Sequence, residues 1–193
     1  MIKRQPALAV FAGGRASRMG GLDKAALMLH GKPLIAYLAA SFSDFSEKLY
    51  MSGTQPYAPE GFAAITDIYH DIGPLGALHA ALLSAKADTV FVVACDMPLL
   101  NHAVFDLLWK NLLSGSQAIL ASTPKGLEPL CAIYRKSCLP AIEAMIAKKE
   151  YSIRRLRDYL PVQTLMMPDT QIFFNVNTPE EMHILRTHPE LFK

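Results

Sequence analysis

The sequence predicts one α/β domain in which helices cover both faces of a mostly parallel β-sheet. Short apolar runs alternate along the chain with longer amphipathic segments, which is the order expected of repeated strand–helix units. The run Thr89-Val90-Phe91-Val92-Val93 is continuously β-branched and aromatic, as in a central parallel strand buried on both faces. With 193 residues, 51% of them hydrophobic, the chain can bury one full core. A three-layer α/β/α arrangement over residues 1–193 is therefore predicted.

The individual elements follow one another in this alternating order. Strands are expected at residues 7–11, 48–51, 63–65, 89–94, 118–121, 130–134 and 162–166. Helices are expected at residues 33–42, 74–84, 103–113, 137–148 and 152–159, with a turn at 168–171. Pro33 suits the first turn of its helix. A last helix is predicted to begin after Thr178 as N-cap, because a proline and two glutamates follow it.

The segment after the first strand has the composition of a phosphate-binding loop. Residues 11–25 read FAGGRASRMGGLDKA, and the glycines allow the backbone to bring N–H groups close to an anion. Arg15, Arg18 and Lys24 supply positive charge. The spacing matches neither G-x-G-x-x-G nor G-x-x-x-x-G-K-[ST]. A solvated glycine-rich turn is the alternative, but three cations among the glycines favour a triphosphate site of another type.

Asp96 directly follows the apolar strand 89–94. Ligands of open α/β sheets bind at the carboxyl ends of the strands, so Asp96 and the glycine loop are expected to face each other. An ionised carboxylate at the end of a buried strand requires a counterion. Mg²⁺ suits this position, since it takes only one or two carboxylates together with phosphate oxygens. The alternative, Asp96 as cap of the next helix, is weakened by Met97-Pro98, and Asn101 is the better cap.

Charge and cysteine content limit the class of protein. A net charge of +2, with the cations concentrated in the first 32 residues, does not suggest a nucleic-acid or membrane partner. Cys95, Cys131 and Cys138 lack C-x-x-C spacing, which argues against a disulfide framework and a structural zinc site. No apolar run approaches the roughly 18 residues of a membrane span. Residues 1–6 lead into a strand and not into a signal-peptide core, so a cytoplasmic protein is expected.

Five segments resemble, in order, the landmarks of one enzyme family. They are RMGGLDK at 18–24, GPLG at 73–76, CDMP at 95–98, EPLCA at 128–132 and NVNTPEE at 175–181. This set resembles the molybdenum cofactor guanylyltransferases of the nucleotidyltransferase superfamily, whose opening motif is L-x-G-G-x-x-x-R-M-G followed by a lysine. The resemblance spans nearly the whole chain and implies a Rossmann-like nucleotidyltransferase fold. Phe11 stands where leucine is usual, Ala77 where a glycine is common, and Ser52 where an asparagine is expected.

The resemblance implies transfer of GMP from GTP to molybdopterin, or to its molybdenum-loaded form, with Mg²⁺ as cofactor and pyrophosphate as product. The acceptor is a phosphate that is already anionic, so neither a covalent nucleophile nor a general base is required. The catalytic residues it implies are Arg18, Lys24 and Asp96, with Asp96 also the metal ligand. The GTP-binding residues it implies are Phe11, Ala12, Gly13, Gly14, Lys24, Ser52, Asp67, Gly73, Pro74, Leu75 and Asp96.

Asp67 is the candidate for recognition of guanine. A carboxylate can accept both N1–H and the 2-amino group of guanine, whereas the N3 acceptor of cytosine would repel it. Asp71 is a nearby rival, and a solvated acid in a turn is the alternative to both. The expected division of the chain therefore assigns GTP to its N-terminal half and molybdopterin to its C-terminal half.

The molybdopterin candidates are Asn175, Asn177, Arg154 and Arg155. The two asparagines flank Val176 at strand spacing, so their amides are expected on one face, where they suit the mixed hydrogen-bonding edge of a pterin. Alternatively, they organise the turn into the last helix. The arginines belong to a basic cluster that suits an anionic substrate, or equally a solvated helix face.

Two other functions remain open at this level. One is a sister enzyme that uses CTP, and the other is a non-catalytic adaptor that binds the pterin or a nucleotide. Retention of Arg18, Lys24 and Asp96 together argues against the adaptor. The expected protein partners are those that insert molybdenum and those that deliver the cofactor to molybdoenzymes.

Overall fold

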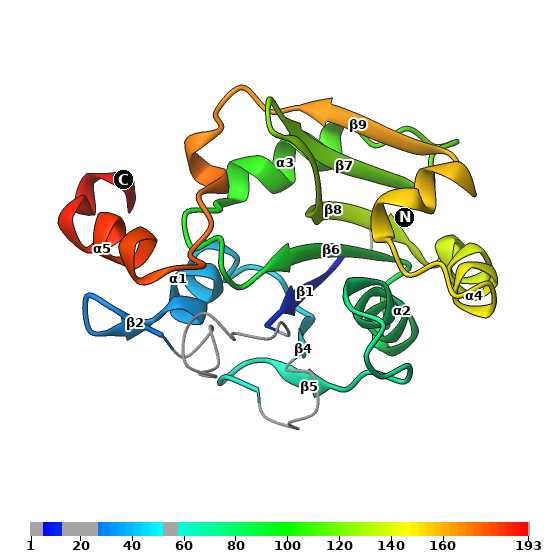
Figure 1. Cartoon of the computed structure of the whole chain (residues 1–193), viewed down its shortest axis with the longest axis horizontal. Helices are drawn as coiled ribbons and strands as arrows, with labels where there is room; N and C mark the ends of the chain where they lie inside the picture. Colours follow the sequence, from blue (N-terminus) through cyan, green and yellow to red (C-terminus); the bar gives the residue numbers. More distant parts are fainter. Residues whose placement is uncertain (1–5, 13–26, 52–57, 193) are drawn as a thin grey trace.

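A seven-stranded sheet forms the centre of the computed structural model, which describes residues 6–12, 27–51 and 58–192. The strand order is β5-β4-β1-β6-β8-β7-β9 (Figure 1). Among these strands β8 alone runs against its neighbours. The strands are β1 (Ala7–Phe11), β4 (Lys48–Met51), β5 (Ala63–Ile65), β6 (Thr89–Ala94), β7 (Ala118–Thr123), β8 (Gly126–Arg135) and β9 (Val162–Met166). A short hairpin, β2 (Met28–Leu29) and β3 (Lys32–Pro33), lies outside this sheet.

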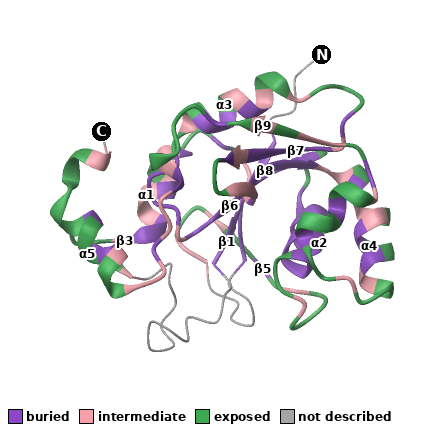
Figure 2. Ribbon diagram, turned by 45° about the horizontal axis from the view of Figure 1, so that its top comes forward, coloured by how far each residue is buried: buried purple, intermediate pink, exposed green. Residues whose placement is uncertain are grey.

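Helices cover both faces of the sheet, which confirms the predicted three-layer fold. Helices α1 (Leu34–Ser41) and α3 (His102–Asn111) pack on one face, and α2 (Pro74–Ser84) and α4 (Leu139–Ala147) on the other (Figure 1). The central strands are buried between these two layers (Figure 2). No helix in the described ranges has the length and apolar character of a membrane span. Cys95, Cys131 and Cys138 are all buried.

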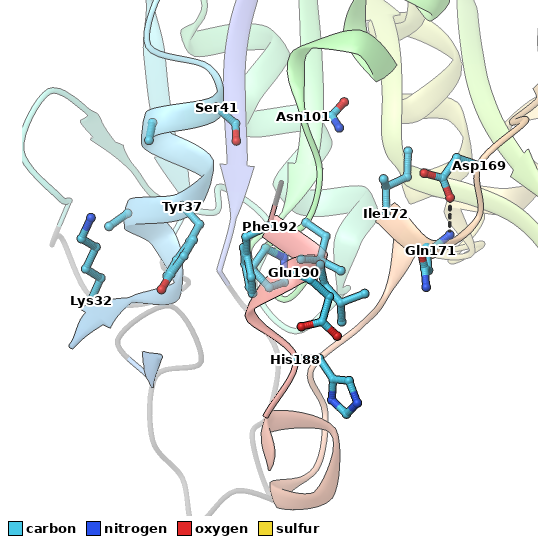
Figure 3. Close-up of a pocket in the computed structure, with 15 residues that line it drawn as sticks. Lys32, Tyr37, Ser41, Asn101, Asp169, Gln171, Ile172, His188, Glu190 and Phe192 are labelled. Atoms are coloured by element: carbon cyan, nitrogen blue, oxygen red, sulfur yellow. Dashed lines mark hydrogen bonds between the residues drawn. The ribbon is translucent and has the colours of Figure 1, made fainter. Parts of the chain in front are cut away.

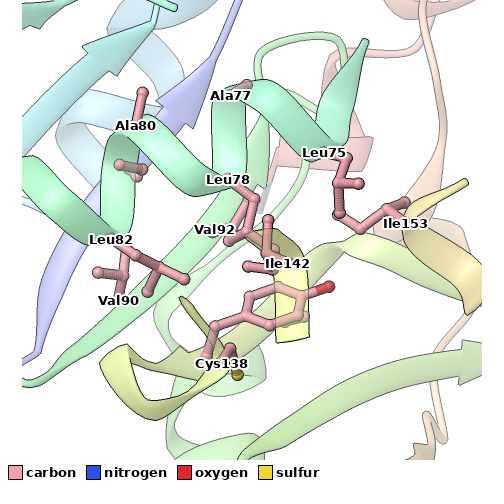
Figure 4. Packing of buried hydrophobic residues seen from close by; sticks show 14 of the residues in the cluster. Leu75, Ala77, Leu78, Ala80, Leu82, Val90, Val92, Cys138, Ile142 and Ile153 are labelled. Carbon is pink, nitrogen blue, oxygen red and sulfur yellow. The ribbon is translucent and has the colours of Figure 1, made fainter. Parts of the chain in front are cut away.

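The layer formed by α2 and α4 is held by close aliphatic packing. Leu78 and Leu82 of α2 lie over Val90 and Val92 of β6 (Figure 4). Burying a leucine side chain stabilises a fold by about 1.5–3 kcal/mol. Ile153, at the start of the 3₁₀ helix η4 (Ile153–Asp158), lies beside Leu75 at the start of α2 (Figure 4). The core therefore sets the position of η4 relative to the N-terminal end of α2.

The strand predicted at 130–134 is twice as long in the structure. It extends to Gly126 because β7 and β8 form a hairpin whose loop is Pro124-Lys125, with Thr123 paired to Gly126. Gly126 has φ +129°, a conformation that L side chains rarely adopt. Residues 126–128 are all half-buried and form no apolar run, which hid the first half of the strand.

Several helix predictions need correction at their ends. Pro33 pairs in β3 and precedes α1 as an extended N-cap, so the prediction that it lies in the helix is wrong by one position. Asn101 is the N-cap residue of α3, but its side chain makes no capping hydrogen bond. The helix predicted at 137–148 starts as the 3₁₀ turn η3 (Lys136–Cys138), and the one predicted at 152–159 is the 3₁₀ helix η4. The turn at 168–171 runs into the 3₁₀ helix η5 (Gln171–Phe173).

The last helix, α5 (Pro179–Thr187), begins as predicted. The Thr178 hydroxyl accepts a hydrogen bond from Glu181 N at 3.2 Å, and the Glu181 carboxylate accepts one from Thr178 N at 3.0 Å. This reciprocal capping box satisfies two N–H groups that the helix itself leaves unpaired. The 3₁₀ turn η6 (Pro189–Phe192) follows α5.

A histidine between two carboxylates joins the segment after α1 to α3. The ring nitrogens Nε2 and Nδ1 of His102 lie 3.0 Å and 3.1 Å from carboxylate oxygens of Asp44 and Asp106. Burial lowers the pKa of His102, but the hydrogen bonds and charges of Asp106 and Asp44 outweigh it, so the pKa is raised above its ordinary value. The ring also packs beside Phe45 and Phe105.

This arrangement predicts a pH-dependent contribution to stability. Because the folded state raises the pKa of His102, its contribution is present below the pKa of an unfolded histidine, about 6.5, and is lost as pH rises through the folded value. Between about pH 6 and pH 8, the unfolding free energy of the wild-type chain should fall more than that of His102→Gln. The extra fall should be at most about 1 kcal/mol, because solvent screens these exposed charges. Urea denaturation at both pH values measures this. Parallel pH dependence in the two proteins would show that His102 does not contribute.

Candidate active site

The start of the glycine loop and Asp96 lie side by side at the carboxyl ends of the central strands. Phe11 pairs with Ala94 across β1 and β6, and Cys95 N donates a hydrogen bond to Phe11 O at 3.0 Å. Ala12 N donates to Met51 O at 2.8 Å, which ties the same point to β4. The predicted residues Gly13, Gly14, Arg18, Lys24 and Ser52 lie outside the described residues.

The chain returns to Asp96 from its C-terminal part. Val176 N donates a hydrogen bond to Asp96 O at 2.8 Å, and the Val176 side chain is fully buried. Asp96 itself is partly buried. This contact brings the predicted acceptor residues Asn175 and Asn177 next to the residue expected to bind the metal, although they are far apart in the sequence.

The two asparagines also take part in local structure. Asn177 N donates to Glu181 Oε2 at 2.6 Å, which extends the capping box of α5, and Asn175 Nδ2 donates to Phe173 O at 3.4 Å. Both residues are partly buried. The two asparagines therefore help to organise the turn into α5, as the alternative interpretation expected, and their role in binding molybdopterin stays a prediction.

Asp67 follows the end of β5 and has an unused acceptor. Its Oδ1 is buried and has no hydrogen-bond partner among the described residues. Burial raises the pKa of Asp67, while the charge of His70 opposes that shift. The rival Asp71 is exposed and adopts φ +61°. A partly buried carboxylate that lacks a donor is the better candidate for a ligand with adjacent N–H groups, because an unpaired buried acceptor costs about 1–3 kcal/mol.

The GPLG segment forms the tight entry to α2. Gly73, the N-cap, has φ +68°, Pro74 is the first helical residue and Leu75 is fully buried. A Cβ on Gly76 would come within 2.8 Å of Tyr69 O and of the Ile72 side chain. The second glycine is therefore needed for close approach between α2 and the segment that carries Asp67.

Glu128 belongs to the same edge of the sheet and was not selected from the sequence. Because β8 is antiparallel, its N-terminal part lies where the parallel strands end. Burial raises the pKa of Glu128. This shift is opposed by the positive charges of Arg154 and Lys125 and by a hydrogen bond from Thr123, whereas the negative charge of Asp96 adds to it. The net shift is upward. The sequence signal was present, since Glu128 opens the EPLCA motif, but only the hairpin geometry relates it to Asp96.

The two predicted arginines have different surroundings. The Nη1 atom of Arg154 would lie 3.5 Å from a Cβ on Gly126, so its guanidinium lies over the β7–β8 hairpin and beside Glu128. Arg155 instead forms ion pairs with Glu150 at 2.9 Å and Asp158 at 3.3 Å. Arg154 is thus the one that lies near Glu128, and the roles of both arginines in binding stay predictions.

Mg²⁺ at Asp96 stays a prediction, and the carboxylate there is of the chemical type that this ion takes. Within the described ranges, no group of three or more His, Cys, Asp or Glu side chains is placed to hold an ion. One partly buried carboxylate, Asp96, beside the start of a glycine loop is the arrangement that suits an ion held mainly by phosphate oxygens and water.

A cavity of about 720 Å³ lies between α1, the loop after β6 and the C-terminal segment (Figure 3). Lys32, Tyr37, Asn101, Gln171 and Phe192 are among its lining residues, and Tyr37 lies beside Phe192 with ring centroids 4.8 Å apart. Neither Asp67, Asp96 nor Glu128 lines it. The three carboxylates of the candidate site therefore do not belong to the wall of this cavity.

Comparison with known proteins identifies the family. The family model described as the MobA-like NTP transferase domain matches residues 8–164. The chain belongs to this family. A probable molybdenum cofactor guanylyltransferase of Clostridium perfringens is 30% identical over 99% of this chain and 100% of that protein, and one of Nostoc is 34% identical over 92% and 88%. The family expected from the sequence is thus confirmed, and the chain is a nucleotidyltransferase.

Solved structures agree with this MobA-like fold. Molybdopterin-guanine dinucleotide biosynthesis protein A from Archaeoglobus fulgidus superposes with a TM-score of 0.79, at 24% identity, over 95% of this chain and 98% of that one. A 4-diphosphocytidyl-2C-methyl-D-erythritol synthase from Anaerococcus prevotii gives 0.73 at 10% identity, over 95% of each chain. The fold therefore does not by itself decide which nucleotide is used.

Gly76→Ala tests the close approach in this MobA-like transferase. Alanine should gain about 1 kcal/mol of helix propensity. The overlap with the Tyr69 carbonyl should cost about 1–3 kcal/mol and displace the segment that carries Asp67. We expect a lower unfolding free energy and weaker GTP binding, measured by urea denaturation and calorimetry. Gly115→Ala, where a Cβ meets open space, is the control and should change neither. Wild-type stability and affinity in Gly76→Ala would contradict the packing argument.

Proposed function

We propose that the chain transfers GMP from GTP to molybdopterin and releases pyrophosphate. The observation that carries this proposal is the order of groups along the carboxyl-end edge of the sheet. Asp67, whose Oδ1 has no hydrogen-bond partner within the part of the chain that the structure describes, lies on one side of Asp96. The segment 175–177 is hydrogen bonded to Asp96 itself. Relatives named as molybdenum cofactor guanylyltransferases align over nearly the full chain, which supports the same choice.

The proposed reaction needs positioning and charge stabilisation from the protein. A terminal phosphate oxygen of the acceptor attacks the α-phosphorus of GTP, and the bond between the α-phosphorus and the bridging oxygen breaks as pyrophosphate leaves. The acceptor phosphate is anionic near neutral pH, so no side chain has to remove a proton. Asp96 would hold Mg²⁺, which supplies positive charge to the phosphate oxygens when bound. Arg18 and Lys24 are proposed to stabilise the charge that develops on the leaving group.

Guanine selectivity is assigned to Asp67. Its carboxylate would accept hydrogen bonds from N1–H and the 2-amino group of guanine, which relieves the cost of its buried oxygen. The Watson–Crick edge of cytosine presents the N3 acceptor beside its amino group, so a CTP would leave one oxygen facing another acceptor. This favours GTP over the CTP-using alternative.

The acceptor would lie on the other side of Asp96. Asn175 and Asn177 are held there through Val176, and Arg154 reaches the same edge from η4. Their amides and guanidinium offer donors to the phosphate and the polar ring of a pterin. A non-catalytic adaptor would need the groups that bind the nucleotide and the pterin. It would not need Asp96 between the GTP side and the acceptor side of the site.

Pyrophosphate release distinguishes these functions. The wild-type chain with Mg²⁺ should release pyrophosphate only when GTP and molybdopterin are both present, and much more slowly with CTP. Asp96→Asn should keep the fold but lose most turnover, because an amide cannot replace the anion that holds the metal. Preferential use of CTP would establish the sister activity. Binding of both ligands without turnover would establish the adaptor, and near-wild-type turnover by Asp96→Asn would show that it does not hold the metal.

Asp67→Asn tests base recognition separately. Its amide is half donor, so one of the two hydrogen bonds to guanine is lost and one repulsive contact with cytosine is removed. We expect the ratio of kcat/KM for GTP to that for CTP to fall by about tenfold or more, corresponding to about 1.4 kcal/mol. Asp71→Asn is the matched control and should leave the ratio unchanged. If Asp71→Asn lowers the ratio and Asp67→Asn does not, Asp71 is the residue that recognises the base.

A further inference from the structure

Two partly buried carboxylates lie on opposite sides of Asp96. Asp67 follows β5, and Glu128 lies in β8, and these strands are on either side of β6 in the sheet. The Asp67 side is the one assigned to guanine above. Glu128 therefore lies in the half of the site that remains for the acceptor.

The core holds this part of β8 in a defined position. The register between β7 and β8 shifts between Leu120, which pairs with Ala132, and Ala121, which pairs with Glu128. Tyr134, fully buried, donates a hydrogen bond from its hydroxyl to Pro129 O at 2.8 Å across this irregularity. Bulges of this kind redirect side chains next to functional sites. The carboxylate of Glu128 is thus placed by a rigid strand and not by a free loop.

Two cations, Arg154 and Lys125, lie near Glu128. Arg154 lies over Gly126, and η4, which carries it, is anchored in the core by Ile153 and Leu156. Lys125 in the hairpin loop adds a second positive charge close enough to lower the pKa of Glu128. Glu128 can only accept hydrogen bonds, and Arg154 and Lys125 beside it are positively charged. This combination suits a ligand that has adjacent N–H donors on a ring and an anionic group elsewhere.

We propose that Glu128 selects the acceptor by accepting hydrogen bonds from N3–H and the 2-amino group of a 2-amino-4-oxopterin ring. This inference rests on the proposed guanylyl transfer. A pterin presents the same adjacent donor pair as guanine, so the carboxylate chemistry assigned to Asp67 for the donor nucleotide applies to Glu128 for the acceptor. Arg154 provides the countercharge for the anionic part of the acceptor. One carboxylate on each side of Asp96 would then recognise one of the two ring systems that the reaction joins.

Glu128→Gln gives a test that a structural role would not satisfy. The glutamine amide offers one acceptor and one donor, which matches the 2,4-dioxo ring of a lumazine, in which an oxygen replaces the 2-amino group. Fluorescence titration with 6-hydroxymethylpterin and 6-hydroxymethyllumazine measures the preference in the full chain. We expect the wild-type chain to bind the pterin at least about tenfold more tightly, and Glu128→Gln to abolish or reverse that ratio. GTP affinity should not change.

The control is Glu143→Gln on α4, whose half-exposed carboxylate contacts His79 and should leave every value unchanged. The inference is overturned if Glu128→Gln keeps the wild-type ratio, or if the wild-type chain does not bind the pterin saturably. It is also overturned if Glu128→Gln slows pyrophosphate release and added Mg²⁺ restores the rate, because Glu128 would then act on the metal. Pyrophosphate release from GTP and molybdopterin reports separately on the proposed function. A pterin preference that depends on Glu128 in a chain without such release would keep this inference and reject guanylyl transfer.

Discussion

The backbone hydrogen bonds at the end of β6 hold the candidate site together. Cys95 N is bonded to Phe11 O before the chain turns at Asp96, and Asp96 O accepts from Val176 N after most of the fold has been traversed. The first bond joins Asp96 to the start of the glycine loop, and the second joins it to segment 175–177. Because peptide groups make both bonds, the arrangement depends on the path of the chain and not on the identity of the side chains.

Helix packing sets the outer limits of the site. On the α2 side, Leu75 and Ile153 share one apolar cluster, so the entry to α2 and the helix that carries Arg154 are positioned by the same contacts. On the other side, a separate cluster under α5 buries Val176 with Leu99 and Met182. Each cluster lies next to polar groups that the proposed reaction uses: Arg154 beside the first, and Asn175 and Asn177 beside the second. Rigid apolar support of this kind is what keeps such groups oriented at little cost when a ligand binds.

The sequence predicted the elements and their order well where local chemistry decides them. The apolar run of β6, the Thr178 cap of α5 and the helix over 74–84 were predicted from local signals, and the structure confirms each. Predictions went wrong where neighbouring segments compete. Pro33 joined a hairpin in place of the helix, and the first half of β8 formed only because β7 pairs with it. The side chain of Asn101 does not cap α3, although the backbone there has the expected extended form.

Residue types and motif spacing alone determined the three-layer fold, the family and most of the candidate residues, because glycine, proline and buried β-branched residues restrict the backbone locally. Tertiary structure decided which of those candidates can act together. It left one oxygen of Asp67 buried without a donor among the described residues, engaged Arg155 in ion pairs, and brought Glu128 and Arg154 to the edge that Asp96 occupies. These relations depend on burial and on charges from segments far apart in the chain, which no local pattern of residues contains.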